Sequence, residues 1–380
     1  MERRQVLQLI GGGVIAAAIA PLSGCSDELP AAAIAAWKGP GGEPDLRRWV
    51  LSHAVLAPHS HNLQSWLVDL REPGVIFLHM DITRTLPYTD PDSRQMVMSQ
   101  GTFLELLDLA ARQRGYRANI ELFPDGEYGA SGPDERPTAT VRLVPDAQLA
   151  PDPLFAQIFR RHTNRLAYAS RIPDREGIAA IFANVADHST KIGFVGMDSD
   201  ENVQAHRDIA MRAWKTELTT ARTAMESLKL MRIGPDEIAE NRDGITINKP
   251  MVRFLSTVGL FDRDKAAPPD SVSVQKQIDD FNNTIASTPA FFWMTTDGNS
   301  RTTQLLAGRA YARAQLTATA YGLSMHPLQQ ALQEYPEQSD AYAAIHALVG
   351  AHRPRQTVQM WARIGYGPRI GPSPSVVFQS

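Results

Sequence analysis

The feature that most constrains the fold is an internal repeat, in which positions 92, 101 and 115 correspond to 299, 308 and 322, an offset of 207 residues. The first copy has Asp-Ser-Arg at 92–94 followed by glycines at 101 and 115, and the second has Asn-Ser-Arg at 299–301 followed by glycines at 308 and 322. Apolar residues between the glycines have helical spacing. Strand-like segments precede each copy (75–80, 290–295) and follow it (138–144, 357–364). Self-similarity at a fixed offset is typical of duplication; the alternative is a coincidence within ordinary α/β patterns.

The repeat predicts an α+β chain of two fused, related lobes, each with a small mixed sheet flanked by helices. We place the first lobe at residues 45–150 and the second at 151–380. Residues 231–274 contain several prolines and many charges, and we interpret them as an insertion in the second lobe that acts as a lid.

The first 25 residues have the pattern of a signal peptide: a charged start with Arg3-Arg4, then an apolar stretch from Leu9 to Leu22. About fifteen apolar residues are too few for a membrane span, which needs ~20. The paired arginines resemble a twin-arginine export signal. Leu22-Ser23-Gly24-Cys25 resembles a bacterial lipobox, with Cys25 as the lipidated first residue of the mature chain. The alternative is a buried N-terminal helix with an incidental cysteine.

These patterns predict export to the periplasmic or cell-surface side and a lipid anchor in the membrane. Residues 26–44, rich in Ala, Pro and Gly, are predicted to be a linker.

Composition excludes several classes of protein. The net charge of −3 argues against a general nucleic-acid binder. A single cysteine excludes an intramolecular disulfide, a zinc ribbon and a cysteine-held iron–sulfur cluster. His59 and His61 are two residues apart and are a weak alternative for a metal pair, but H-E-x-x-H is absent, so we predict no metal.

Two polar segments are candidates for ligand binding. The first runs from 57 to 66, reads Ala-Pro-His-Ser-His-Asn-Leu-Gln-Ser-Trp, and contains His59, Asn62 and Gln64. The second runs from 159 to 168, reads Phe-Arg-Arg-His-Thr-Asn-Arg-Leu-Ala-Tyr, and places three arginines within six residues. Clustered guanidinium groups are suited to a phosphate.

These segments resemble the A-P-S-x-x-N-x-Q-P-W and R-R-S-x-R-x-F loops of the flavin-dependent nitroreductase superfamily. The stretch 320–328, Ala-Tyr-Gly-Leu-Ser-Met-His-Pro-Leu, resembles the superfamily segment in which a backbone amide faces the flavin N5. The arrangement is most similar to the Acg-type branch, in which two lobes are fused in one chain.

The resemblance implies an FMN site. Arg161, Thr163 and Arg165 would contact the phosphate and ribityl chain, and the loop with His59, Asn62 and Gln64 the ribityl chain or ring edge. Pro327 and Leu328 would lie in the N5-facing segment. Three positions depart from the family pattern: His162 replaces an arginine, Ser65 replaces a proline, and Ser373–Val377 stands in place of a basic pair, for which Arg369 is the candidate substitute.

The expected function is that of an exported FMN-dependent oxidoreductase that passes electrons through flavin N5 to a small nitro- or quinone-like acceptor. The donor would be a membrane carrier or partner protein, and the pseudo-dimer would be monomeric. No side chain is assigned a catalytic role, because the flavin does the chemistry. The alternatives are an FMN-sequestering protein without turnover and a scaffold that has lost its flavin.

Overall fold

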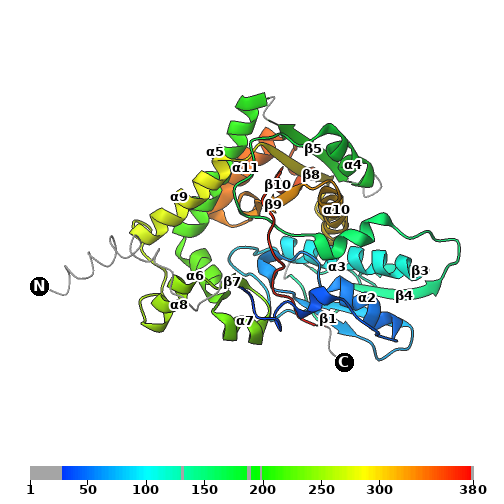
Figure 1. The fold of residues 1–380 in the computed structure, drawn as a ribbon. Coiled ribbons are helices and arrows are strands. Elements are labelled where there is room, and N and C mark those ends of the chain that lie inside the picture. The colour runs from blue at the N-terminus through cyan, green and yellow to red at the C-terminus, as the bar shows by residue number, and fades with distance from the viewer. Residues whose placement is uncertain (1–27, 130–131, 186–189, 197–198, 378–380) are drawn as a thin grey trace, which may run out of the picture.

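A computed structural model of the chain describes residues 28–129, 132–185, 190–196 and 199–377. The predicted signal peptide and Cys25 lie outside the described residues. Figure 1 shows two lobes, each a sheet with its helices, and a helical excursion at one side of the molecule. This arrangement confirms the predicted α+β class.

The first lobe has four strands in the order β1-β2-β4-β3. They are β1 (Trp66–Asp69), β2 (Val75–Met80), β3 (Tyr116–Leu122) and β4 (Ala139–Pro145). Its helices are α2 (Leu46–Ala54) and α3 (Arg94–Gln113), with short 3-10 helices η1 (Ala35–Lys38) and η2 (Ser60–Asn62) nearby.

The second lobe has four strands in the order β5-β8-β10-β9, the same topology as the first. They are β5 (Thr190–Gly196), β8 (Ala290–Asp297), β9 (Ser324–Pro327) and β10 (Gln356–Gly365). Its helices are α4 (Arg175–Val185), α5 (Asp200–Thr219), α6 (Ala221–Lys229), α9 (Val272–Ala286), α10 (Arg301–Ala320) and α11 (Ser339–Leu348), with η3 (Pro153–Arg160), η5 (Gln329–Leu332) and η6 (Pro336–Gln338).

The prediction that each sheet is mixed was wrong, because all named strand pairs in the two four-stranded sheets are antiparallel. The reason lies in the strand order. A long helix joins β2 to β3 and β8 to β9, and the strands it joins run in parallel. The last strand of each lobe, β4 or β10, inserts between them and pairs antiparallel with both.

Helices α3 and α10 pack against each other between the two sheets (Figure 1). Leu305 and Leu316 of α10 belong to the hydrophobic core of the first lobe, whereas Met98 of α3 belongs to that of the second. The lobes therefore share their interior through this helix pair.

The insertion forms a small unit on the first lobe. It contains β6 (Met231–Ile233), α7 (Pro235–Asn241), β7 (Ile245–Ile247) and α8 (Pro250–Thr257), and β6 and β7 pair in parallel. Gly244 N–H donates to the Asn62 carbonyl at 3.0 Å, and Arg84 pairs with Asp243 at 2.7 Å. The insertion thus covers part of the first polar loop.

The described part of the predicted linker packs on the protein instead of extending from it. Ala33 is fully buried, and the Trp37 indole N–H donates to the Ser373 carbonyl at 2.8 Å. The Ala and Trp side chains within this Ala-, Pro- and Gly-rich segment supply these contacts. Within the described ranges, no helix is long and apolar enough to cross a membrane.

Candidate functional site

The second polar loop begins where η3 ends and carries a buried arginine between the lobes. Arg161 donates to the Gln315 Oε1 at 3.1 Å and to the Leu56 carbonyl at 3.0 Å, whereas its buried Nε has no partner. Burial lowers the pKa of Arg161 to about 10. Neutral acceptors therefore hold the guanidinium in place without balancing its charge.

Two further arginines lie nearby. Arg165 makes no hydrogen bond or ion pair within the described residues; its side chain reaches solvent but is crowded by protein, which lowers its pKa. Arg363 on β10 is fully buried, donates to the Leu166 carbonyl at 2.8 Å, and leaves its Nη1 unpartnered. Burial, and then the charge of Arg165, lower the pKa of Arg363.

Neutral groups complete the surroundings of Arg165. Burial and the charge of Arg165 lower the pKa of His61 to about 4. His326, which accepts from the Arg363 Nε at 3.0 Å, has its pKa held well below the ordinary value, mainly by burial and then by Arg363 and Arg165. The Tyr311 hydroxyl is buried without a partner, and burial raises its pKa.

Arg161, Arg165 and Arg363 form a group that we call the arginine cluster. No member pairs with a carboxylate among the residues that the structure describes, although other arginines of this chain do, such as Arg309 with Glu105 at 2.8 Å. Uncompensated buried charge is costly. A cluster without a counter-charge is therefore suited to an anionic ligand.

Thr163 and Asn164 fix the loop that carries Arg161 and Arg165. Thr163 forms a parallel bridge with Met325 of β9, and Asn164 Nδ2 donates to the Pro368 carbonyl at 2.7 Å. These contacts join the loop to the second lobe.

The first polar loop is tied to other segments through its predicted ligand residues. Asn62 Nδ2 donates to the Pro374 carbonyl at 3.0 Å, and Gln64 accepts from Val376 N–H at 2.9 Å and donates to the Arg242 carbonyl at 2.8 Å. His59 contacts the Ser60 carbonyl and the Ser65 hydroxyl, both at 2.8 Å. The serine-rich tail and the insertion thus use the polar atoms that the resemblance assigned to FMN.

Pro327 and Leu328 occur at the end of β9. Leu328 N–H donates to the Trp361 carbonyl at 2.7 Å, and proline has no N–H. Neither residue offers a free backbone donor for a flavin N5. Arg369 lines a cavity of about 440 Å³ together with His162, Asn164 and Gly367, beside the arginine loop. This volume is in the range of small-molecule sites.

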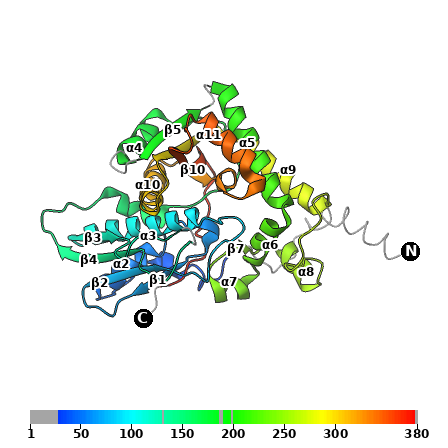
Figure 2. The same cartoon turned by 180° about the vertical axis from the view of Figure 1, so that it is seen from behind.

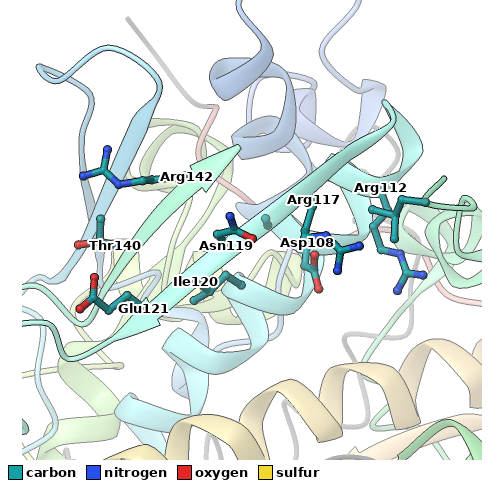
Figure 3. Close-up of a pocket in the computed structure, with 10 residues that line it drawn as sticks. Asp108, Arg112, Arg117, Asn119, Ile120, Glu121, Thr140 and Arg142 are labelled. Atoms are coloured by element: carbon teal, nitrogen blue, oxygen red, sulfur yellow. The ribbon is translucent and has the colours of Figure 1, made fainter. Parts of the chain in front are cut away.

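A larger cavity, of about 500 Å³, lies on the first lobe (Figure 3). Arg117, Asn119 and Glu121 of β3 line it together with Asp108 and Arg112 of α3. Side chains of both charge signs line this cavity and no predicted site residue takes part, so the arginine cluster is the stronger candidate for a functional site.

The two repeated arginines serve the contact between lobes. Arg94 of the first lobe is fully buried against Glu334 and donates to the Leu332 carbonyl at 2.7 Å. Arg301 of the second lobe donates to the Asp92 carbonyl at 2.6 Å. Among the described residues, no group of His, Cys, Asp or Glu side chains is placed to hold a metal ion.

Sequence reasoning missed Arg363, His326 and Tyr311 as site residues. Arg363 had a detectable signal, because it is a charged residue within the otherwise apolar run Met360–Ile364 of a strand. Tyr311 had no detectable signal in the sequence, because a tyrosine on an apolar helix face is typical of a hydrophobic core.

The fold and site define a two-lobed α+β protein with a cluster of arginines, without a carboxylate partner among the described residues, where the lobes meet. No family model matches the chain. The chain is 27% identical over 331 residues to a Mycobacterium tuberculosis protein named "Putative NAD(P)H nitroreductase", and the match covers 84% of this chain and 85% of that protein. This similarity spans both lobes and supports the resemblance to the nitroreductase superfamily.

Solved structures overlap less well. A nitroreductase from Bacteroides fragilis with bound FMN is 11% identical, with a TM-score of 0.33, and the overlap covers 57% of this chain and 89% of that chain. The nitroreductase NfnB from Mycobacterium smegmatis in complex with NADPH is 16% identical, with a TM-score of 0.32 and coverage of 57% and 92%.

Proposed function

We propose that this chain is an FMN-dependent oxidoreductase of the nitroreductase type. The observation that carries the proposal is the arginine cluster without a carboxylate. FMN contains a phosphate, and the unpartnered Nε of Arg161 and Nη1 of Arg363 are donors that such an anion satisfies. The residues present therefore fit the cofactor at its phosphate end.

Arg161, Arg165 and Arg363 would hold the phosphate, and Thr163 and Asn164 would keep their loop in place. When bound, FMN supplies the redox chemistry, taking electrons from a donor and passing them to an acceptor. His61 and His326 are neutral at pH 7, so they offer hydrogen bonds without adding charge to the cluster. The hydroxyl of Tyr311 on α10, which is close enough to Arg161 and Arg165 to interact with their charges, is a further donor.

The acceptor would be a small nitro- or quinone-like molecule. The relative's name points to NAD(P)H as the donor for that protein. For an exported chain we propose a membrane carrier or partner protein instead, because nicotinamides are scarce outside the cytoplasm. Export would follow the twin-arginine-like leader, with Cys25 as the lipid anchor, and the Acg-type, single-chain architecture would make the protein a monomer.

A turnover measurement tests the enzyme assignment. The purified protein, loaded with FMN and supplied with dithionite, is mixed with a nitroarene or a quinone. Repeated reduction of the acceptor, at a rate above that of the same concentration of free FMN, is the expected result. A single reoxidation without catalytic turnover would instead favour an FMN-sequestering protein.

A further inference from the structure

The insertion contains a helix with an apolar face that the described protein leaves partly exposed. No residue of α8 is buried. Met251, Phe254, Leu255 and Val258 have the spacing i, i+3, i+4 and i+7, which places them on one stripe of the helix. Phe254 is 55% exposed and Val258 is 48% exposed. We call these four residues the α8 stripe.

Further apolar side chains extend this surface. Leu260, in the turn after α8, is 51% exposed, and Val272, at the start of α9, is 71% exposed. Figures 1 and 2 show α8 and the start of α9 together at one end of the molecule. Clustered exposed apolar residues on a monomer mark a surface that contacts a membrane or another protein.

The start of the described chain lies at the same place. Asn248, two residues before α8, donates from its Nδ2 to the carbonyl of Glu28 at 2.7 Å. Glu28 follows the predicted lipid anchor Cys25 by three residues. Three residues span at most roughly 10 Å. A lipid on Cys25 would therefore hold the base of α8 within about that distance of the bilayer surface.

The charges beside the stripe fit a phospholipid headgroup layer. Lys249 and Arg253 lie on α8 or immediately before it, and neither forms an ion pair in the described part of the chain. An amphipathic helix with basic residues beside an apolar stripe binds in the plane of the membrane interface.

We propose that the α8 stripe inserts into the interface of the membrane to which the chain is anchored, so that the protein contacts the bilayer at two points. The lipid on Cys25 tethers the chain at one point, and a second contact in the plane of the interface fixes the orientation of the protein on the bilayer. The proposal rests on the anchoring part of the proposed function and is independent of the flavin.

Site-specific fluorescence tests this inference in the full chain. In the anchored protein the lipid occupies the sulfur of Cys25, the single native cysteine, so Phe254→Cys provides the single free thiol for an environment-sensitive fluorophore. Leu67→Cys is the matched control, because Leu67 is 52% exposed on β1 of the first lobe. Both proteins, purified with their lipid, are reconstituted into vesicles of phosphatidylethanolamine and phosphatidylglycerol, with and without nitroxide-labelled lipid.

The expected result is a blue shift of the probe at 254 and quenching by nitroxide lipid about twofold or more above that of the probe at 67. Equal quenching at the two positions, or failure of both variants to sediment with the vesicles, would overturn the proposal. A shift at 254 that depends on protein concentration without vesicles would identify a second copy of the chain as the occupant, and would also overturn it. Membrane release of Cys25→Ala, tested separately, distinguishes failure of the anchor from failure of the stripe.

Discussion

Gly101 and Gly308 face each other's helices at the crossing of α3 and α10. A Cβ on Gly101 would stand 1.9 Å from the carbonyl oxygen of Leu305, and a Cβ on Gly308 would stand 1.9 Å from that of Met98. Real Cβ atoms do not approach backbone oxygens so closely, so both positions require glycine. The repeated glycine is thus a requirement of the contact between lobes.

Substituting either glycine tests that requirement. Gly101→Ala or Gly308→Ala forces the two backbones apart, and we expect a loss of about 2 kcal/mol or more in the free energy of unfolding, even after alanine's higher helix propensity is counted. Urea denaturation measures it. Gly42→Ala is the control, because a Cβ there meets nothing within 4 Å. Equal stability of the three variants would contradict the close helix contact.

Arg165 distinguishes a ligand-binding role from a structural one. Arg165 has no carboxylate partner among the described residues, and its positive charge repels that of Arg363. Arg165→Gln is therefore expected to leave the stability of the FMN-free protein unchanged or to raise it. The affinity for FMN is expected to fall at least about tenfold. The charge of Arg165 lowers the pKa of His61 in the parent protein, so this pKa, measured by NMR, is expected to be higher in Arg165→Gln.

Arg71→Gln is the matched control, since Arg71 is exposed and pairs with Asp69 at the surface of the first lobe. Unchanged FMN affinity in Arg165→Gln would remove this arginine from the site.

His206 makes stability dependent on pH. Its Nδ1 accepts from the Trp361 indole N–H at 3.1 Å, and burial lowers its pKa to about 4 from 6.5. Between these values the unfolded chain binds the proton and the folded chain does not. The stability is therefore complete above pH 6.5 and falls towards pH 4, by roughly 3 kcal/mol for this group.

Thermal unfolding between pH 7 and pH 4 measures the effect. His206→Gln keeps an acceptor for Trp361 but does not titrate, so its loss of stability over this range is expected to be smaller than that of the parent protein. The buried carboxyl groups of Asp90 and Glu217, whose pKa values burial raises to about 7, act in the opposite direction and are common to both proteins. Parallel pH curves would contradict the role of His206.

Cys25 tests export and anchoring. In cells that make the full chain, Cys25→Ala is expected to move the protein from the membrane fraction to the soluble periplasmic fraction, because the lipid is lost. Replacing Arg3 and Arg4 with lysine is expected to retain the protein in the cytoplasm. A membrane-bound Cys25→Ala protein carrying an intact leader would show that the leader itself, and not a lipid, is the attachment.

Local patterns predicted the elements of this fold well. The strand expected at 75–80 matches β2, and those expected at 138–144 and 357–364 match β4 and β10 to within one residue at each end. Apolar runs bounded by turn residues specify such strands directly. Strand order depends on tertiary packing, which places the last strand of each lobe between the two strands that the long helix joins, so the antiparallel pairing could not be predicted.

The site was predictable only where its residues are adjacent in sequence. Arg161 and Arg165 were found because they share one short segment. Arg363 joins them from a strand about two hundred residues later, through a fold that brings β10 beside the loop. The partners of Asn62 and Gln64 likewise come from the tail and the insertion, whose positions no local pattern contains.

The most direct test of the account is a titration of the purified protein with FMN, followed by visible absorption and flavin fluorescence. The account predicts one FMN bound per chain, a yellow protein that dithionite bleaches, and weaker binding as phosphate is added, because phosphate competes for the arginine cluster. A colourless protein that takes up no added FMN would contradict the assignment of the arginine cluster to a flavin.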